Sequence, residues 1–299
     1  MLFQKTNPQD KRKKLRDDLK SGKLLKFPGA FSPLVAMLLE QQGFDGIYIS
    51  GAVLANDLGY PDIGLTTLSE VAGRGRQIAR VTALPSIIDI DTGFGEPMNV
   101  ARSIMELTEL GIAGCHLEDQ QNPKRCGHLD GKSLVETEEM IKKIKAADRA
   151  KSDKNFLLIA RTDARASLGL EKAIDRAKAF VDAGAEMIFP EALQNEKEFE
   201  LFRKEIKVPL LANMTEFGKS PLLNDKTLSN LGFNVVIYPV TSLRLAMKAV
   251  EDGFMKIKTQ GDQNQLLEQM QHRKRLYEIL NYESYNEFDQ GVFNFKLKD

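Results

Sequence analysis

The sequence of 299 residues predicts an α/β fold, and more specifically a (β/α)8 TIM-type barrel. Eight short apolar segments are each followed by a longer amphipathic segment, which is the chain order of such a barrel. The short segments are continuously apolar, as expected of parallel strands that are buried on both faces. The rival, an open doubly wound sheet, usually carries a glycine-rich phosphate loop after its first strand. Phe27-Pro28-Gly29-Ala30-Phe31 has no such pattern, so the barrel is favoured.

The bounds of the predicted elements follow from where the apolar runs begin and end. The predicted strands are Leu24–Phe27, Gly46–Ser50, Leu84–Ile90, Ala113–Leu117, Phe156–Ala160, Met187–Phe189, Val208–Ala212 and Asn234–Tyr238. The predicted helices that follow them are Pro33–Gln42, Leu68–Val81, Pro97–Leu110, Ser133–Ala150, Leu170–Ala183, Asn195–Glu205, Asp225–Leu231 and Thr241–Gly253. Pro97 suits a first helical turn, and Gly111 and Gly184 stand where the preceding helices should end.

Both ends of the chain add to this minimal barrel. A helix is predicted over Asp10–Lys20, and a further helix over Gln263–Leu280 is followed by a polar tail with aromatic residues. No linker rich in serine or proline divides the chain, so we predict one domain over residues 1–299 with an N-terminal helix and a C-terminal helical extension. A surplus C-terminal helix often packs between subunits.

The composition narrows the class of protein. The formal net charge is zero, whereas sequence-independent nucleic-acid binding needs a basic face. The one dense basic run, Lys11-Arg12-Lys13-Lys14, is predicted to be the solvated face of the first helix. Two cysteines cannot form a disulfide framework, the N-terminus lacks a signal peptide's apolar core, and no apolar run is long enough to span a bilayer. We therefore expect a soluble, cytoplasmic protein.

Polar side chains follow nearly every predicted strand at its carboxyl end. In barrels of this kind the catalytic residues lie at that rim. The residues at these ends are Tyr48, Ser50, Gly51, Asp89, Asp91, His116, Glu118, Asp119, Arg161, Asp163, Glu191, Asn213, Met214, Thr215 and Arg244. So many acids, arginines and amides at one rim indicate a polar site.

Asp89 and Asp91 suggest a metal site. Because they are two residues apart on a predicted strand, their side chains should project to the same face. Two carboxylates this close repel each other unless a cation or a shared proton compensates. Oxygen ligands with retained waters suit Mg²⁺ or Mn²⁺ better than zinc, and Glu118 could join directly or through water. The alternative is a pair of solvated loop acids, or acids that cap the next helix.

Arginines would bring positive charge to the same rim. Arg161, Arg244 and Arg273 could each bind a carboxylate through a bidentate guanidinium fork. Together with Mg²⁺ they predict a small substrate that carries several carboxylates. The alternative is that Arg161 pairs with a neighbouring aspartate and that Glu191 is a buried partner of an arginine. Tyr48 is either a core aromatic or a group that donates or takes a proton.

One short loop carries a potentially reactive cysteine. Cys126 lies between Lys124-Arg125 and His128, and nearby cations favour the thiolate and lower the pKa of a thiol. Gly127 allows the backbone to turn beside it. We therefore expect a thiol whose pKa is lowered by its neighbours. The alternative is a basic surface loop that happens to contain a cysteine.

Taken together, these segments resemble the isocitrate lyase/phosphoenolpyruvate mutase superfamily. The resemblance runs through nearly the whole chain and rests on Tyr48-Ile49-Ser50-Gly51, Asp89-Ile90-Asp91-Thr92-Gly93-Phe94-Gly95, His116-Leu117-Glu118-Asp119-Gln120, Lys124-Arg125-Cys126-Gly127-His128, Ala160-Arg161-Thr162-Asp163-Ala164 and Asn213-Met214-Thr215-Glu216. The cysteine loop is the specific element. It marks the branch that cleaves carbon–carbon bonds in 2-hydroxy tricarboxylates, because mutase-like members lack it.

The resemblance implies a role for each site residue. It implies Mg²⁺ at Asp89, Asp91 and Glu118, Cys126 as the general acid, and Glu191 as the residue that orients it. Tyr48 and a metal-bound group remain alternative bases. The implied substrate contacts are Ser50, Gly51, Ala52, Asp62, Lys124, Arg125, Cys126, Gly127, His128, Arg161, Glu191, Asn213, Met214, Thr215, Arg244 and Arg273.

The compact length is similar to that of the family members that cleave 2-methylisocitrate to pyruvate and succinate in the propionate-degrading methylcitrate cycle. Isocitrate-cleaving members are longer, and cleavage of isocitrate to glyoxylate and succinate is the alternative activity. Cys126 counts against an oxaloacetate-type decarboxylase and a phosphonate-processing enzyme, and together with the carboxylate pair against a non-catalytic carboxylate-binding barrel. Ala52 departs from the family, which usually has glycine there. The resemblance also implies a homotetramer whose last helices are exchanged between subunits.

Overall fold

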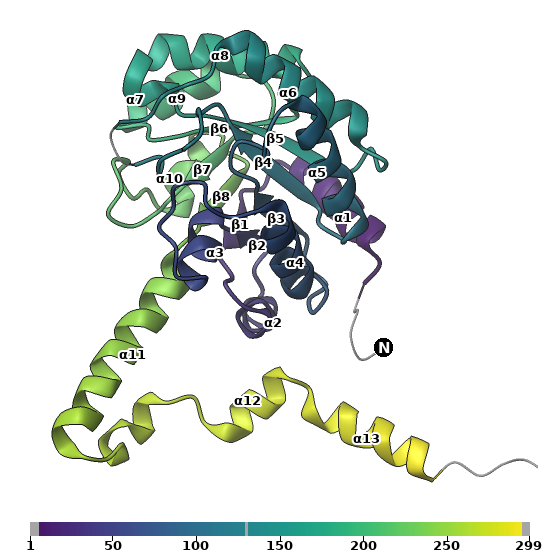
Figure 1. The fold of residues 1–299 in the computed structure, drawn as a ribbon, viewed down its shortest axis with the longest axis vertical. Coiled ribbons are helices and arrows are strands. Elements are labelled where there is room, and N and C mark those ends of the chain that lie inside the picture. The colour runs from purple at the N-terminus through teal and green to yellow at the C-terminus, as the bar shows by residue number, and fades with distance from the viewer. Residues whose placement is uncertain (1–5, 129–130, 295–299) are drawn as a thin grey trace, which may run out of the picture.

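The computed structural model describes residues 6–128 and 131–294, and these form a barrel of parallel strands surrounded by helices (Figure 1). The strands are β1 (Leu25–Pro28), β2 (Ile47–Ile49), β3 (Ser86–Asp89), β4 (Gly114–Glu118), β5 (Leu157–Thr162), β6 (Met187–Pro190), β7 (Leu211–Asn213) and β8 (Val235–Tyr238). Two parallel ladders, β2-β3-β4-β5-β6 and β1-β8-β7, are joined by the bridges Gly29–Tyr48 and Ile188–Leu210. These bridges close the barrel, so the predicted fold class is confirmed.

Each strand leads into a helix on the outside of the barrel, in the predicted order. These helices are α2 (Pro33–Gln41), α4 (Leu68–Ala79), α5 (Pro97–Glu109), α6 (Thr137–Ala150), α8 (Leu170–Asp182), α9 (Glu196–Glu205), α10 (Asp225–Asn230) and α11 (Thr241–Gln260). Two short helices, α3 (Gly51–Asp57) and α7 (Ala164–Leu168), lie in the connections and were not predicted. Ser50 caps α3 by accepting a hydrogen bond from the Val53 amide, which turns a polar strand end into a helix start.

The strands are apolar throughout because they are buried on both sides. On β5, Leu158 and Ala160 join the layer between strands and helices, whereas Leu157 and Ile159 join the cluster inside the barrel. This alternation is the two-residue period of a strand. It carries over to the polar residues at the carboxyl ends, and so decides which of them face the barrel interior.

Helix α1 (Pro8–Lys20) packs on the barrel and differs from the prediction for its basic run. Lys11 and Arg12 are buried, not solvated. The Lys11 ammonium donates to the Ala79 carbonyl (2.7 Å), and the Arg12 guanidinium donates to the Ile112 carbonyl (2.9 Å) and pairs with Asp153. Ala79 is the last residue of α4, and Ile112 lies between α5 and β4, so neither carbonyl has a partner within a helix and the cations supply one.

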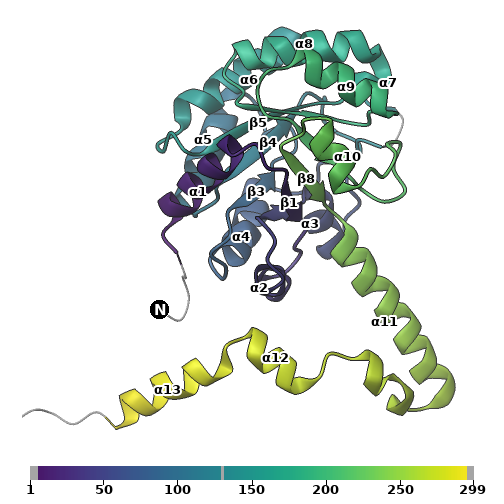
Figure 2. The same cartoon turned by 180° about the vertical axis from the view of Figure 1, so that it is seen from behind.

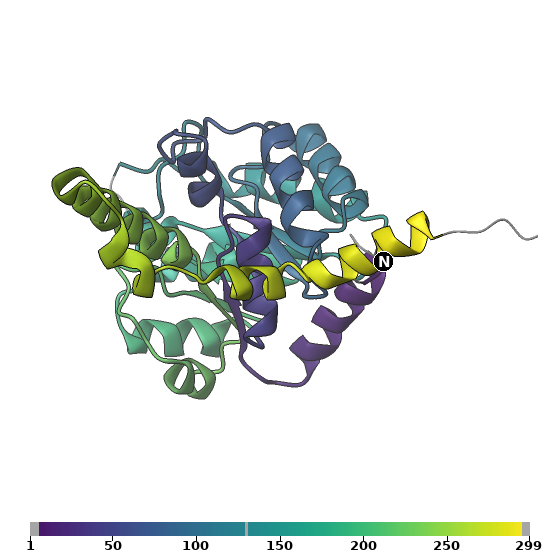
Figure 3. The ribbon, with the colours of Figure 1, turned by 90° about the horizontal axis from the view of Figure 1, so that it is seen from below.

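The C-terminal arm, residues 241–294, leaves the barrel along α11 and returns below it (Figures 2 and 3). It continues through a 3-10 helix (Asn264–Gln269), α12 (Arg273–Ile279) and α13 (Tyr282–Phe293). The single helix predicted over Gln263–Leu280 is therefore wrong, and the predicted tail is largely helical. Helix α11 also runs past Gly253, because the left-handed residue that ends it is Gly261 (φ 85°).

Much of the arm's apolar surface is exposed. No residue of α11 or α13 is buried. The exposed apolar residues of the arm include Leu245, Met247, Val250, Phe254, Met255, Tyr282, Tyr285, Phe288 and Phe293. Within the described part of the chain, no helix is long and apolar enough to cross a membrane.

Candidate active site

The polar residues predicted at the strand ends do converge at the carboxyl end of the barrel. Strand alternation directs Tyr48, Asp89, His116, Glu118 and Arg161 to the interior, and all five are buried. Below them the barrel is filled by apolar side chains such as those of β5 and β6. The polar groups therefore form the floor of a site at the rim where barrel enzymes carry out their chemistry.

Asp89 and Asp91 are held together by a turn, and not by strand geometry as predicted. Strand β3 ends at Asp89, and Asp91 follows with a left-handed backbone (φ 47°). The Asp91 amide donates to Asp89 Oδ1 (3.0 Å), and the Gly51 amide donates to Asp89 Oδ2 (3.2 Å). A Cβ on Gly51 would lie 2.9 Å from Asp89 Oδ2, so only glycine lets the backbone approach this carboxylate so closely.

The acids leave buried oxygen atoms without hydrogen-bond partners. Both carboxylate oxygens of Glu118 lack a hydrogen-bond partner, although Arg161 Nη1 lies 3.3 Å from one of them, and Asp91 Oδ1 has only the ammonium of Lys124, 2.8 Å away. Burial raises the pKa of Asp91 to about 6 and that of Glu118 well above its usual range, which means that further positive charge would stabilise the ionised acids. Among the described residues no three His, Cys, Asp or Glu side chains converge to bind a metal directly. The oxygen donors thus fit Mg²⁺ held by one or two carboxylates and waters.

Lys124 is the cation that faces these acids. Its ammonium lies 2.8 Å from Asp91 Oδ1 and also pairs with Asp62. Although burial acts to lower it, the surrounding carboxylates raise the pKa of Lys124 well above its usual value. The structure therefore brings the predicted residues Asp62 and Lys124 together with the carboxylate pair.

Cys126 differs from the prediction in its ionisation. The thiol is partly buried, and burial raises its pKa above the usual range. Burial outweighs the expected lowering because two of the three neighbouring basic side chains face acids: Lys124 pairs with Asp62 and Asp91, and His128 donates to a glutamate. The thiol is therefore protonated at neutral pH, which suits a proton donor better than a nucleophile.

Glu191 and His128 connect the cysteine loop, residues 124–128, to β6 and β7. His128 Nδ1 accepts from the Lys219 amide (2.9 Å), so Nε2 carries the proton and donates to Glu191 Oε1 (2.7 Å). The Asn213 amide lies 3.4 Å from both carboxylate oxygens of Glu191. Although burial acts to raise it, Arg161 and His128 hold the pKa of Glu191 far below its usual range.

Arg161 is the central cation of the floor. It makes two hydrogen bonds to Asp163 (2.9 and 3.1 Å) and approaches Glu118 (3.3 Å) and Glu191 (3.4 Å). The alternative that Arg161 pairs with a neighbouring aspartate is thus confirmed, and so is the expected pairing of Glu191 with an arginine. Gly127 packs closely against this cluster, since a Cβ there would lie 2.3 Å from Arg161 Nη2.

A buried Tyr48–His116 pair was missed by sequence reasoning. The Tyr48 hydroxyl lies 2.7 Å from His116 Nε2, and His116 Nδ1 lies 3.7 Å from Asp89 Oδ1. Burial raises the pKa of Tyr48 well above its usual value and lowers the pKa of His116 to about 4, so both are neutral. The available signal was the spacing of His116 from Glu118, which puts both on the interior face of one strand.

Three of the predicted substrate-contact residues have side chains outside the buried floor of the site. Arg244 is partly exposed and is held by the carbonyl (2.6 Å) and carboxylate (2.9 Å) of Glu216. The side chain of Met214 belongs to the core between strands and helices, so only its backbone remains available. Arg273 is exposed on α12, in the C-terminal arm, and so is not part of this chain's own barrel rim.

Comparison with known proteins agrees with this geometry. The family model described as phosphoenolpyruvate phosphomutase matches residues 15–258. A Corynebacterium glutamicum protein named probable 2-methylisocitrate lyase 2 is 56% identical over 96% of this chain and 94% of its own length. The 2-methylisocitrate lyase of Bacillus subtilis is 47% identical over 92% of this chain and 91% of its own.

Solved structures with similar sequences have the same fold. Oxaloacetate acetylhydrolase with the inhibitor 3,3-difluorooxalacetate superposes with a TM-score of 0.91 at 33% identity, covering 98% of this chain and 100% of the other. Phosphonopyruvate hydrolase with oxalate and Mg²⁺ has a TM-score of 0.86 at 33% identity, covering 94% and 98%. The chain belongs to the phosphoenolpyruvate mutase/isocitrate lyase superfamily.

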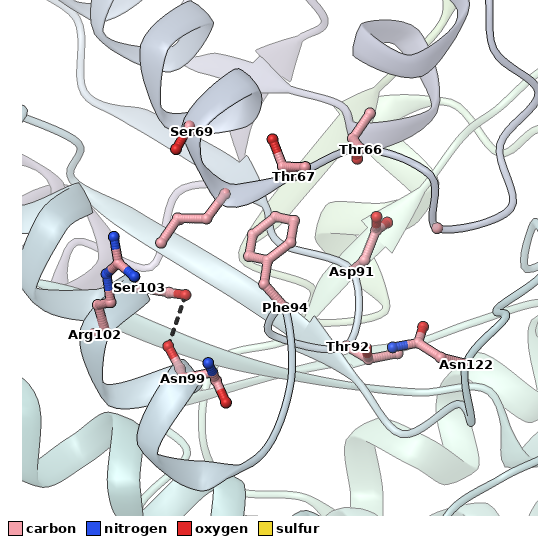
Figure 4. A pocket seen from close by; sticks show the side chains of 12 residues that line it. Thr66, Thr67, Ser69, Asp91, Thr92, Phe94, Asn99, Arg102, Ser103 and Asn122 are labelled. Atoms are coloured by element: carbon pink, nitrogen blue, oxygen red, sulfur yellow. Dashed lines mark hydrogen bonds between the residues drawn. The ribbon is translucent and has the colours of Figure 1, made fainter.

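A cavity on the side of the barrel also leads to one carboxylate of the site. A cavity of about 390 Å³ between the start of α4 and α5 reaches Asp91. Figure 4 shows Asp91 and Phe94 among the residues that line this cavity, with Thr66 and Thr67 above Asp91 in the view and Asn122 below it. Hydroxyl and amide groups line much of this cavity, which gives water and small ions a polar route to Asp91.

Proposed function

We propose that the protein is a Mg²⁺-dependent carbon–carbon lyase that cleaves 2-methylisocitrate to pyruvate and succinate. The observation that carries the proposal is the placement of the cysteine loop, which packs against Arg161 and Glu191 through Gly127 and pairs with Asp91 through Lys124; burial raises the pKa of the Cys126 thiol in this loop. Relatives that bear this activity in their names are 41–58% identical over at least nine-tenths of the chain. The methylcitrate cycle of propionate degradation is then its metabolic place, and both free cysteines agree with a reducing cytoplasm.

Mg²⁺ would be held by Asp89 and Asp91, with Glu118 nearby through water. When bound, it supplies positive charge that acidifies the substrate's 2-hydroxyl group. Gly51 and Ala52 would line the pyruvate half of the substrate, where the backbone approaches Asp89. Mn²⁺ has the same preference for oxygen ligands and should replace Mg²⁺.

Tyr48 is the base that this geometry favours. A buried phenolate alone would be unfavourable, because burial raises the pKa of Tyr48. The phenol can instead pass its proton to His116 Nε2, 2.7 Å away, as it takes the proton of the 2-hydroxyl group. The carboxylate of Asp89 would then face the charged imidazole.

Cleavage of the C2–C3 bond leaves its electron pair on the succinate half. Arg161, Asn213, Thr215 and Arg244 would bind the carboxylates of this half and stabilise the developing charge. The Cys126 thiol then donates its proton to the carbanion carbon, which completes succinate and leaves a thiolate. One proton returns from His116 to the thiolate through solvent, so the overall reaction neither gains nor loses a proton.

The C-terminal arm fits the exchange of helices between subunits of a homotetramer. Its exposed apolar side chains need a covering surface, and a neighbouring barrel would supply one. In such an assembly Arg273, which is exposed on α12, would reach the rim of the neighbouring subunit. We regard residues 1–299 as one barrel domain with this extension.

A coupled lactate dehydrogenase assay tests the proposed function. Pyruvate should form from 2-methylisocitrate, and addition of EDTA should abolish its release. Isocitrate is the matched comparison, because it lacks only the methyl group and would yield glyoxylate. A methyl group is worth about 1–3 kcal/mol in a pocket, so a preference of roughly 10- to 200-fold is expected. No pyruvate from 2-methylisocitrate in the presence of Mg²⁺ would refute the proposal.

A further inference from the structure

The segment that carries Cys126 is a loop whose two ends are joined by backbone hydrogen bonds. The Gln121 amide donates to the Ser133 carbonyl (2.8 Å), and the Val135 amide donates to the Asp119 carbonyl (2.9 Å). These antiparallel contacts fix where the chain leaves and re-enters the barrel rim. They do not fix the cysteine loop itself, whose position depends on contacts made by side chains.

Lys132 makes such a contact from outside the Lys-Arg-Cys-Gly-His motif. Its side chain is 2% exposed, and its ammonium donates to the carbonyl of Gly127. The same ammonium lies 3.1 Å from Asp163 Oδ1. That oxygen also accepts from Arg161 Nη2 (3.1 Å), so one carboxylate links the loop to the central cation of the site.

The contact of Lys132 matters because Gly127 lies against the floor of the active site. A Cβ on Gly127 would lie 2.3 Å from Arg161 and 2.6 Å from Glu191, so the backbone here is already packed on the floor of the site. Lys132 holds the carbonyl of the same residue. The Gln120 side chain holds the start of the loop through the Arg125 amide and carbonyl (2.9 Å each), and Lys124 and His128 pair with acids of the site, so Lys132 is the side chain that holds Gly127.

We propose that Lys132 is a positioning residue that latches the cysteine loop in its closed position. Without the ammonium, Gly127 loses its link to Asp163, and the tip of the loop should open more often. Opening exposes the thiol of Cys126 and removes it from the site. The effect on turnover rests on the proposed lyase function, whereas the latch itself does not.

The test is the rate at which Ellman's reagent labels Cys126 in the full-length protein. Cys115 is fully buried and should not react with the reagent, and the Cys126→Ser variant measures the background rate of labelling at Cys115. Lys132→Met should speed labelling at least about tenfold, because local opening becomes easier. Lys151→Met is the matched control: that lysine is 9% exposed and pairs with Asp148 and Glu186 (3.0 Å each), away from the loop.

The outcomes separate the latch from the lyase proposal. Acceleration in Lys132→Met that Lys151→Met lacks supports the latch. Labelling that is unchanged by Lys132→Met, or equally faster in both variants, overturns it. If Lys132→Met does not melt cooperatively, Lys132→Gln is judged by the same criteria. Faster labelling in a protein that never turns over 2-methylisocitrate would overturn the lyase and leave the latch standing.

Discussion

Gly127→Ala offers a sharp test of whether the closed loop is the catalytic conformation. The substitution adds one methyl group and changes no charge. That carbon would lie 2.3 Å from Arg161 Nη2 and 2.6 Å from Glu191 Cγ. An ordinary contact is about 3.5 Å, so the loop or the guanidinium must retreat by about 1.2 Å, which is 3.5 minus 2.3. A shift of that size at a catalytic group lowers turnover by roughly 100-fold.

The measurements are steady-state kinetics with 2-methylisocitrate and thermal unfolding of the same samples. We expect kcat to fall by about two orders of magnitude while the melting temperature changes little, since the loop can lift away from the barrel. Gly73→Ala is the matched control, because nothing lies within 4 Å of a Cβ at that helical position. It should keep full activity and gain about 0.5–1 kcal/mol of stability. Normal turnover by Gly127→Ala would refute the catalytic role of the closed loop.

Three further predictions concern single groups. Cys126→Ser should lower kcat by roughly 10²- to 10⁴-fold while calorimetry finds Mg²⁺ affinity unchanged; surviving activity would mean that another group donates the proton. Asp91→Ala should raise the Mg²⁺ concentration needed for half-maximal activity, and an unchanged titration would sink its assignment as a ligand. Burial lowers the pKa of Lys11 from 10.5 to about 8, so the unfolded state binds more protons between those values. Stability should therefore rise with pH in this window by up to about 3 kcal/mol, and Lys11→Met should lack that rise in chemical denaturation.

The barrel could be predicted because its signal is local. Each strand is a short apolar run bounded by glycine or by polar residues, and burial on both faces makes the run continuous. The same boundaries place Asp89, Glu118, Arg161 and Glu191 at the rim, because the residue after a buried run must lie near its carboxyl end. Strand alternation then sends these side chains to the interior, so the position of these four residues at the rim follows from sequence.

The partners of these residues could not be predicted in the same way. Lys11 and Arg12 look like a solvated basic run until the fold brings carbonyls 68 and 100 residues away beside them. Lys132 reads as an ordinary loop lysine until the barrel sets Asp163 next to it. The path of the C-terminal arm is likewise undetermined locally. Gly261 ends α11, and helix propensity favours both α11 and α13, but packing sets their direction.

The ionisation state of Cys126 could not be predicted from the sequence either, and it decides whether the thiol acts as an acid or as a nucleophile. A sequence shows that two basic residues and a histidine surround the thiol, and proximity alone argues for a thiolate. The fold gives two of these three side chains acidic partners, since Lys124 faces Asp62 and Asp91 and His128 faces Glu191. Burial then outweighs the backbone hydrogen bond of His128 and the charge of Arg161, which act to lower the pKa of the thiol, and favours the neutral form. A thiol that keeps its proton until a carbanion forms beside it is an acid, and the same cations that fail to ionise it hold the loop against the site.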